Sequence, residues 1–344
     1  MGELDHYQDI RGHCGLSTGY ADDNACIPAP KPGEGIQIHI GPSNYADPAE
    51  VAKYIMKPGE ESSECFTIRT PNTEKVTYQT FLLSGRTGTH HMINTIYSGD
   101  MPTGSFGPCG GFAADPENPD APAPIGSLPG ASKAYMPRSK VAPEFAHVGR
   151  ELDANALMQG DMHYFNFTDK DILREVWLNL YFASPETPVT EFSDQIRGFG
   201  GLGWNWEPIE PGTDMVYQYE CPIMGNGKIM SLLGHYHAHG KHFSASIKRA
   251  SGTIEKVFEM FDYLDPATFD YNSVTTNPMF SANAAGATSG ILEVSAGDIL
   301  QWECHILNDS NVALGYTNEV MTGEMCNVWG YSIGTGTPIT CDHP

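Results

Sequence analysis

The stretch DILQWECHI, residues 298–306, alternates apolar with polar side chains along most of its length. A period of two residues is typical of a β-strand that buries one face and exposes the other. Similar segments recur through the chain: GIQIHI at Gly35–Ile40, ECFTIR at residues 64–69, VWLNLYFA at residues 176–183 and HFSASIK at residues 242–248. Helical periodicity is scarce, apart from one short helix expected at residues 48–56 with Asp47 as its N-cap. The pattern predicts an all-β protein.

Composition and breaks in the pattern indicate two β domains. The 344 residues are 40% hydrophobic, enough for two ordinary domains with cores of their own. The 37 glycines and 25 prolines suit the turns of an all-β architecture. Residues 102–143, rich in Pro, Gly and Ala, predict a long surface loop. The segment ASPETP at residues 183–188 puts two prolines after a strand and predicts the domain boundary near residue 187.

The charge balance is strongly acidic, with 42 acidic against 19 basic side chains. The acidic residues are scattered along the chain, which fits a well-solvated surface. Such a surface argues against nucleic acid and against anionic membranes as partners. No segment is long and apolar enough to span a membrane.

The cysteines predict disulfides rather than a metal knuckle. There are eight, an even number, and no CxxC pair occurs, which argues against a structural zinc site and a thioredoxin motif. Four disulfides imply an oxidising compartment. The first residues are polar, so we expect a secreted or periplasmic protein whose signal peptide has been removed. The cysteines are Cys14, Cys26, Cys65, Cys109, Cys221, Cys304, Cys326 and Cys341.

Two histidine motifs precede residue 187. His90 and His91 are adjacent in TGTHHMI, where a strand is expected to begin. Neighbouring side chains of a strand point to opposite faces, so this pair can share one metal ion only if the backbone is bent there. Without that bend, chance or a surface pair explains it. His163 lies in the apolar segment GDMHYFN, where a hydrogen-bonded core histidine is the simpler interpretation of a lone imidazole.

A denser motif follows after residue 187. His235 and His237 form an HxH pair, which would present two imidazoles on one face of a strand. With His239 and His242, four of the chain's 13 histidines fall close together, and the alternative is a solvated histidine-rich loop. Met325 in TGEMCNVW by itself suits a core position. Imidazoles bind both copper oxidation states and a thioether favours Cu(I), so two histidines and one methionine would suit reductive activation of O2.

Taken in this order, the segments resemble the copper type II, ascorbate-dependent monooxygenases, which include peptidylglycine α-hydroxylating monooxygenase and dopamine β-monooxygenase. The resemblance covers most of the chain after about residue 35. The matching motifs are HHM at residues 90–92, MHY at residues 162–164, HYHAHGK at residues 235–241 and GEMCNVWGY at residues 323–331, with IEPG at residues 209–212 and VSAGD at residues 294–298 in support.

The resemblance implies two tandem antiparallel β-sandwich domains of jelly-roll-like form, each with one copper ion. They would occupy residues 35–186 and 187–344, after an N-terminal extension at residues 1–34. The implied reaction is hydroxylation of a C–H bond of a small organic substrate, with O2 and with ascorbate or another one-electron reductant.

The resemblance also implies the ligands. The electron-supplying copper would be held by His90, His91 and His163. The catalytic, O2-activating copper would be held by His235, His237 and Met325. His239 and His242 fall outside the motif, and we expect them beside the ligands or on the surface.

The family's cysteine pattern implies a set of disulfides. These are Cys65–Cys109 in the first domain and Cys221–Cys341 and Cys304–Cys326 in the second, with Cys14–Cys26 left as a local bridge. Cys304–Cys326 would tie the segment that carries Met325 to its neighbour. Counting alone cannot choose among the many pairings of eight cysteines.

Three departures from the family bear on the substrate. Leu233 stands where amidating members have an arginine that binds a peptide carboxylate, Trp329 stands in place of a tyrosine, and Asp161 in place of a glutamine. Loss of a bidentate guanidinium argues against a peptide with a C-terminal glycine as substrate. Asn327 is kept, and with Trp329 it is the expected substrate contact, although core packing also explains a tryptophan there.

Three other functions fit parts of the pattern. A copper-binding protein of the same fold without monooxygenase turnover would keep the ligands. A zinc hydrolase would use His163, His235 and His237 and have little need of Met325. A carbohydrate- or surface-binding β-sandwich would carry the histidines incidentally. The sequence does not name the substrate, the reductant or the oligomeric state.

Overall fold

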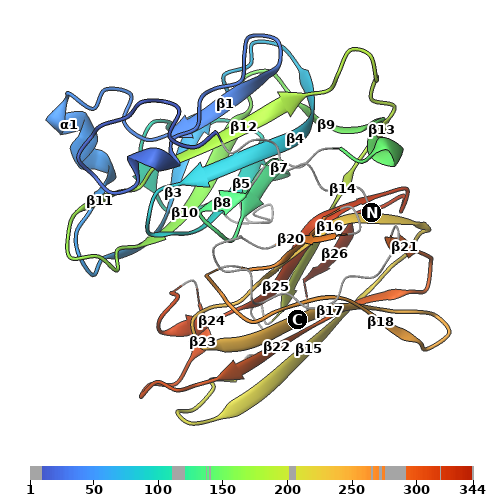
Figure 1. Cartoon of the computed structure of the whole chain (residues 1–344). Coiled ribbons are helices and arrows are strands. Elements are labelled where there is room, and N and C mark those ends of the chain that lie inside the picture. The colour runs from blue at the N-terminus through green and yellow to red at the C-terminus, as the bar shows by residue number, and fades with distance from the viewer. Residues whose placement is uncertain are drawn as a thin grey trace. The chain divides into compact units, whose positions relative to one another are not determined.

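The chain divides into two units, Met1–Thr190 and Glu191–Pro344. The computed structural model (Figure 1) describes residues 10–110, 121–136, 138, 141–200, 207–264, 266–270, 273–275, 292–317 and 319–342. Strands dominate these residues. The helices described are short: η1 (Asp23–Ala25), α1 (Pro48–Val51), η2 (Ala52–Tyr54) and η3 (Pro143–Phe145).

The first unit contains two main antiparallel sheets. One has the order β1 (Gly35–Ile40), β12 (Val176–Phe182), β4 (Val76–Gly85) and β9 (Val148–Leu152), with β8 (Tyr135–Met136) beside β4. The other has the order β6 (Phe106–Gly107), β3 (Glu61–Arg69), β10 (Leu157–Phe165), β5 (Thr89–Tyr97) and β7 (Pro124–Ala131). The short strands β2 (Ile55–Met56) and β11 (Ile172–Leu173) form a separate pair.

Both of these sheets contribute to one apolar core. Ile38 and Ile40 of β1 and Leu178 of β12 come from one sheet, and Met158 and Met162 of β10 come from the other. All are buried. Two sheets that share a core between their inner faces form a β-sandwich.

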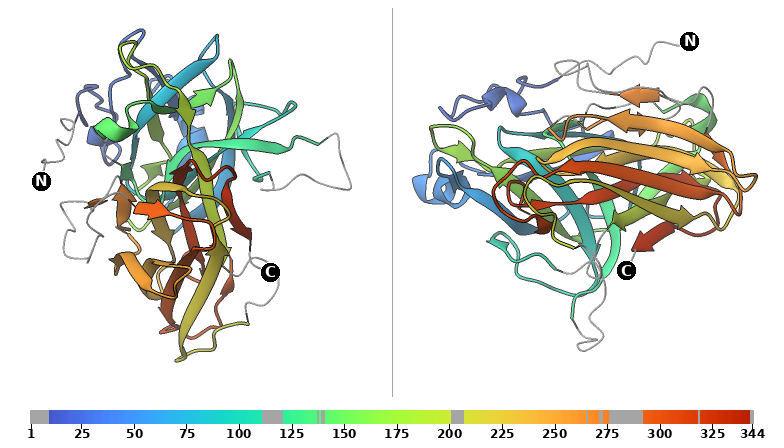
Figure 2. Two further views of the ribbon diagram at one scale, coloured as in Figure 1. Left: turned by 90° about the vertical axis from the view of Figure 1, so that its right-hand side faces the viewer. Right: turned by 90° about the horizontal axis from the view of Figure 1, so that it is seen from below.

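The second unit repeats this organisation. One sheet has the order β20 (Ser273–Thr275), β19 (Thr268–Asp270), β16 (Gly227–His235), β25 (Cys326–Ile333), β14 (Asp194–Gly200) and β26 (Ile339–Asp342), with β21 (Leu292–Val294) beside β16. Its strands are antiparallel except that β26 is parallel to β14. The other has the order β15 (Asp214–Pro222), β22 (Ile299–Leu307), β17 (Gly240–Lys248) and β18 (Ile254–Met260). In Figure 2 the long yellow, orange and red strands of this unit run alongside one another. A short pair completes it, in which β23 (Gly315–Tyr316) lies beside β24 (Gly323–Glu324). The short strand β13 (Glu191–Phe192) precedes β14 in sequence but belongs to neither sheet of this unit.

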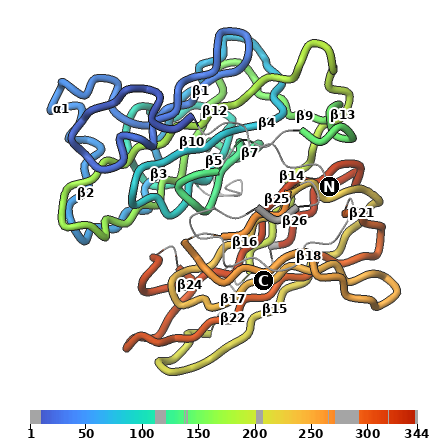
Figure 3. Tube along the Cα trace, in the orientation of Figure 1, coloured from blue at the N-terminus to red at the C-terminus, as the bar shows by residue number. Residues whose placement is uncertain are grey.

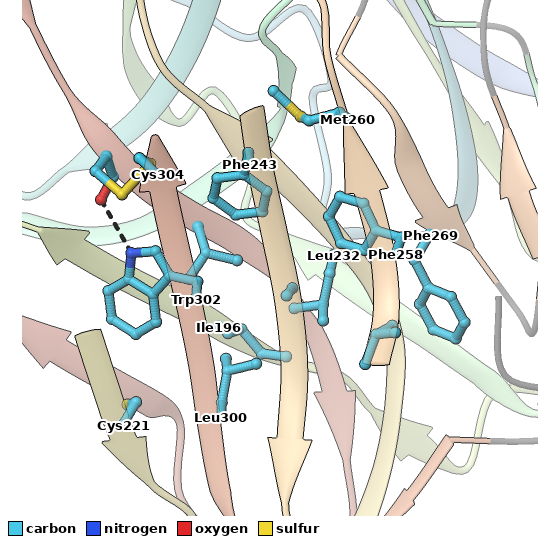
Figure 4. Close-up of a cluster of buried hydrophobic side chains, with 14 of the residues drawn as sticks. Ile196, Cys221, Leu232, Phe243, Phe258, Met260, Phe269, Leu300, Trp302 and Cys304 are labelled. Carbon is cyan, nitrogen blue, oxygen red and sulfur yellow. Dashed lines mark hydrogen bonds between the residues drawn. A yellow bond between two sulfur atoms is a disulfide. The ribbon is translucent and has the colours of Figure 1, made fainter. Parts of the chain in front are cut away.

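The core of the second unit explains the alternation in residues 298–306. Trp302 and Cys304 of β22 are fully buried, while Glu303 and His305 between and beyond them are partly exposed. In Figure 4 the Trp302 indole lies among apolar side chains, and its Nε1 donates a hydrogen bond to the Cys326 carbonyl oxygen at 3.0 Å. The buried face of β22 thus meets β25 of the opposite sheet.

Among the described residues every cysteine is paired, and the four pairs are those that the family pattern implies. They are Cys14–Cys26, Cys65–Cys109, Cys221–Cys341 and Cys304–Cys326. Cys221–Cys341 joins β15 to β26, and Cys304–Cys326 joins β22 to β25. Each of these two bonds therefore links the two sheets of the second unit.

The expected all-β sandwich class is confirmed, but two local predictions need correction. The loop expected at residues 102–143 is wrong in its middle, because β7 pairs with β5. Proline at positions 124 and 129 obscured this strand, and it is tolerated because β7 is an edge strand of its sheet. Residues 111–120 of that stretch lie outside the described part of the chain.

The helix expected at residues 48–56 is shorter than predicted. The α-helical part ends at Val51, a 3-10 turn follows to Tyr54, and β2 begins at Ile55. Asp47 does cap this helix, since its carboxylate accepts hydrogen bonds from the amides of Ala49 and Glu50. In the described residues, no helix has the length and apolar character needed to cross a membrane.

Candidate metal centres

An irregularity in β5 brings the adjacent histidines of the first unit together. His163 of β10 is the register partner of His91, and Tyr164 is the partner of Thr89, so His90 is an extra residue without a register partner. Such a bulge bends the strand and redirects a side chain. This is the bend that two neighbouring histidines need in order to serve one ion.

Gly88 fixes the start of β5 just before these histidines. Its φ of +94° favours glycine, and an added Cβ would lie 2.6 Å from Ile172 Cδ1 and 2.8 Å from the Phe165 carbonyl oxygen. A hydrogen bond also joins the two segments here, because the Phe165 amide donates to the Gly88 carbonyl oxygen at 2.8 Å. The backbone around His90 is therefore held by the strand that carries His163.

The result is a candidate metal site made of His90, His91 and His163, which is called the first metal centre below. One ligand atom from each lies within 4.8 Å of the others. The three ring centroids are 5.0–5.2 Å apart, and all three side chains are buried. Ligands at about 2.0–2.1 Å from one ion lie roughly 3–3.5 Å from each other, so small rotations of the rings would close the site on a metal.

Two carboxylates lie beside the first metal centre. Glu61 on β3 contacts His163 Nε2 at 2.8 Å, and Asp161 lies 3.6 Å from His91 Nε2. Burial lowers the pKa of His163, while the Glu61 hydrogen bond opposes this effect. A carboxylate on the far nitrogen of a histidine fixes its orientation toward a metal and offsets the metal's charge. Asp161 thus stands where the family has a neutral glutamine and adds negative charge.

In the second unit, strand pairing brings His235 beside the segment that carries Met325. β16 and β25 are neighbouring strands (Figure 3), and His235, the last residue of β16, is the register partner of Asn327 in β25. Asn327 Nδ2 in turn donates to Met325 Sδ at 3.4 Å. The Asn327 side chain is itself fixed, because its Oδ1 accepts bonds from the Gly200 amide and the Tyr316 hydroxyl, both at 3.2 Å. Asn327 therefore orients the thioether next to His235.

His237 does not lie on the same strand as His235, although the HxH spacing predicted that it would. β16 ends at His235, so His237 lies in the turn before β17 rather than on the strand. Its Nδ1 lies 3.3 Å from the Gly323 carbonyl oxygen. A carbonyl oxygen can only accept, so Nδ1 carries the proton in this bond and Nε2 becomes the nitrogen suited to a metal.

His235, His237 and Met325 make up a candidate metal site, which is called the second metal centre below. Their exposed fractions are 1%, 0% and 6%, and the two imidazoles meet edge to face with centroids 5.2 Å apart. Gly240 closes the turn beside them, because a Cβ there would lie 2.0 Å from Tyr236 Cδ2. Any larger residue at that position would force the Tyr236 ring or the backbone of the turn to shift.

A buried carboxylate, Glu324, lies between the two halves of this centre. It precedes Met325 directly, and its oxygens accept hydrogen bonds from the amides of His237, His239, Gly240 and Met325. Burial raises the pKa of Glu324 to about 7, although the amide hydrogen bonds act in the opposite direction.

The remaining histidines of the motif have other contacts. His239 is buried, with Nδ1 2.7 Å from Asp309 Oδ1 and Nε2 3.1 Å from the Met321 carbonyl oxygen. Both of its nitrogens face acceptors, which leaves neither directed at a metal. Hydrogen bonds from Lys241 and His239 lower the pKa of Asp309 to about 2. His242 lies on the outward face of β17, 3.5 Å from Glu259.

Trp329 stands on the same face of the sheet as His235. Its ring centroid lies 5.2 Å from that of His235 and 5.9 Å from that of Phe199 on β14. In the strand register, Leu233, Trp329 and Arg197 form one cross-strand row next to the row of His235 and Asn327. Trp329 is partly exposed, unlike the fully buried Val328 beside it, so core packing alone does not explain its position.

Both centres have donor sets that copper accepts. Three imidazoles suit copper and also zinc, whereas two imidazoles with a thioether favour copper as Cu(I). Sequence reasoning missed Glu61 and Glu324, which touch the ligand segments. Glu324 lies within the matching motif next to Met325, but Glu61 is more than a hundred residues from His163 in sequence, and only the pairing of β3 with β10 brings them together.

No family model and no curated protein matches the chain. Among solved structures, it is similar to PNGF-II in the P21 space group, with a TM-score of 0.29 and 9% identity over 90% of this chain and 66% of that one. PNGF-II in the C2 space group gives a TM-score of 0.27 with the same identity and coverage. The chain thus spans just under two thirds of those chains.

Proposed function

We propose that the protein is a copper-dependent monooxygenase that hydroxylates a C–H bond of a small organic substrate, using O2 and a reductant such as ascorbate. The observation that carries the proposal is the second metal centre. There a buried methionine segment is fixed beside two buried histidines by Asn327 and Glu324. A hydrolase would have little use for a thioether at that position.

The first metal centre supports the same function. One histidine triad and one set of two histidines and a methionine lie in separate β-sandwich units of one chain. When bound, copper would supply one-electron redox chemistry and O2 activation. A reaction that consumes two electrons from a one-electron reductant suits two such centres.

The chain's own residues would prepare each site. Glu61 hydrogen-bonds to Nε2 of His163, and the Gly323 carbonyl oxygen hydrogen-bonds to Nδ1 of His237. These bonds fix the orientations of the two imidazole rings. The Met325 thioether is oriented by the Asn327 amide. Burial of the ligands keeps bulk water from the donor atoms, so the ring nitrogens need no large rearrangement to meet an ion.

We assign the substrate to the sheet face that carries Trp329, where the buried Asn327 side chain is engaged with Met325 and supports the ligand rather than the substrate. Trp329 offers a partly exposed indole within 5.2 Å of the His235 ring, which suits an apolar or aromatic group. Leu233 occupies the next position of the row and offers no charge to a carboxylate. A small organic molecule with an apolar reacting carbon fits this face better than a C-terminal glycine.

The four disulfides support an oxidising compartment, secreted or periplasmic, as the working location of the protein. The strong negative charge, with 42 acidic against 19 basic residues, favours small-molecule substrates over nucleic acid as partners.

The test is ascorbate-driven O2 consumption by the copper-loaded protein across a panel of small aromatic and aliphatic compounds. Wild type should consume O2 in proportion to hydroxylated product. The His90→Ala and Met325→Ile variants should each lose at least about 100-fold of the substrate-dependent rate, because each removes a metal ligand.

Two exposed residues provide matched controls. His13→Ala and Met224→Ile change the same residue types at exposed positions, and both should keep the wild-type rate. Tight binding of two coppers without substrate-dependent O2 consumption for any compound would instead support a copper-binding protein without turnover. Full activity in Met325→Ile would contradict the proposal.

A further inference from the structure

Glu324 is a fully buried carboxylate that binds only backbone amides in the hydrogen bonds found for it. Oε1 accepts from the His239 amide at 2.7 Å and from the Gly240 amide at 2.9 Å. Oε2 accepts from the His237 amide at 2.8 Å and from the Met325 amide at 3.3 Å. Both oxygens are therefore engaged, and the side chain is 0% exposed.

The donors belong to the two segments that supply the ligands of the second metal centre. Residues 237–239 form the turn between β16 and β17, where the amides lie outside the strand ladders. Met325 lies between β24 and β25. Because buried amides need acceptors, the turn keeps this shape only if a group such as the Glu324 carboxylate accepts their hydrogen bonds.

Charge adds a second reason for a carboxylate at this position. A buried carboxylate is costly unless hydrogen bonds or a positive charge compensate it. Four amide hydrogen bonds supply part of the compensation, and a cation bound next to Met325 would supply more. A neutral residue in the same place would give up this complementarity.

We propose that Glu324 is the positioning residue of the second metal centre. It binds the turn that carries His237 to the segment that carries Met325, so that the imidazole and the thioether are assembled before a metal arrives. Both carboxylate oxygens face amides, which makes Glu324 a support for the ligands and not a ligand. The claim that Glu324 supports metal binding rests on the proposed function. The claim that it joins the two ligand segments rests on the hydrogen bonds alone.

The test variant is Glu324→Gln, which keeps the size of the side chain but replaces one oxygen with an NH2 group. That group faces either the His237 and Met325 amides or the His239 and Gly240 amides, and in both cases donors oppose donors. The control is Asp298→Asn. Asp298 is also a buried carboxylate of the second unit that accepts backbone amides, from Ser295 and Ala250, but it touches no ligand segment.

The first readout needs no metal. In hydrogen–deuterium exchange of the metal-free protein, Glu324→Gln should raise exchange at least about 10-fold in a peptide covering residues 236–241. Asp298→Asn should leave that peptide at the wild-type rate. Unchanged exchange in Glu324→Gln would overturn the inference whatever the metal content.

The second readout is the Cu(I) affinity of each centre, measured by competition with a Cu(I) chelator. Loss of a group that orients ligands typically weakens metal binding about 10–100-fold. Glu324→Gln should therefore lower the Cu(I) affinity of one centre by that factor and leave the affinity of the other unchanged. Asp298→Asn should leave both affinities unchanged. If Glu324→Gln still bound two Cu(I) ions with wild-type affinity, the inference about Glu324 would be overturned and the proposed function would stand. A wild-type protein that binds no copper would overturn the proposed function, and with it the metal role of Glu324.

Discussion

Arg86 and Glu175 form a buried ion pair, and Arg86 lies just before β5, the strand that carries His90 and His91. The Arg86 Nε to Glu175 Oε2 distance is 2.6 Å, and the two side chains are 1% and 0% exposed. Arg86 also contacts Asp23 at 2.9 Å, and the other Glu175 oxygen accepts from His39 and Tyr45. The pair thus joins the N-terminal segment to the residues that precede β5.

The cost of breaking this pair follows from its burial. Removing one partner of a buried ion pair leaves an uncompensated charge and costs about 3–5 kcal/mol, whereas replacing both with apolar residues costs much less. Arg86→Met and Glu175→Leu should each destabilise the first unit by about that amount. The double variant should be no worse than either single one, which corresponds to a coupling of at least about 3 kcal/mol.

The effect should extend to the metal site. The Arg86 carbonyl oxygen accepts from the Thr89 amide at 3.2 Å and from the Thr89 hydroxyl at 2.7 Å, immediately before His90. Arg86→Met keeps this carbonyl oxygen but removes the side-chain anchor of the residues before His90, so it should weaken copper at the first centre and leave the second centre unchanged.

Native-state hydrogen exchange is the appropriate assay, because a chain of two units need not unfold in one step. Peptides from β4 and β5 report the opening free energy of the first unit, and peptides from β22 serve as the internal control. Single variants that cost under about 1 kcal/mol, or costs that simply add in the double variant, would refute the reasoning.

Two further predictions concern the second unit. Gly240→Ala should destabilise it by about 1–3 kcal/mol and weaken its copper, because the added Cβ would lie 2.0 Å from the Tyr236 ring. In Gly315→Ala the nearest contact is an ordinary 3.8 Å, so unfolding and metal titrations should not change, and equal effects in the two variants would exclude the steric explanation. Burial raises the pKa of Asp298, but hydrogen bonds from Ser295, Ala250 and Arg249 outweigh it and hold the pKa below its usual range. The free energy of unfolding that the ionised Asp298 contributes is present above about pH 4 and is lost as the pH falls through its lower native pKa. Asp298→Asn should therefore flatten the acid limb of the stability curve measured by urea unfolding. An unchanged limb would contradict this assignment.

The sequence predicts the fold class well because strand alternation is a local property. In residues 298–306 the buried set includes Leu300, Trp302 and Cys304, as the pattern requires. The same reasoning failed at β7, where prolines concealed an edge strand. Edge strands need fewer ladder hydrogen bonds, so their composition departs from the usual strand pattern.

The candidate centres show a similar limit. The sequence indicates which histidines and which methionine to consider, but not how they are held. The bulge at His90 and the end of β16 at His235 arise from strand pairing across the sheet. Glu61 and Glu324 contact the ligand segments through tertiary structure, which spacing along the chain does not reveal.

The most direct test of the central claim is X-ray absorption spectroscopy of the protein loaded with two equivalents of Cu(I). We expect nitrogen scattering from imidazoles together with a sulfur contribution of about half a sulfur per copper, since only the second centre contains Met325. The sulfur signal should disappear in Met325→Ile and persist in Met224→Ile. Wild-type spectra without sulfur, or a sulfur signal that remains in Met325→Ile, would contradict the assignment of the second metal centre.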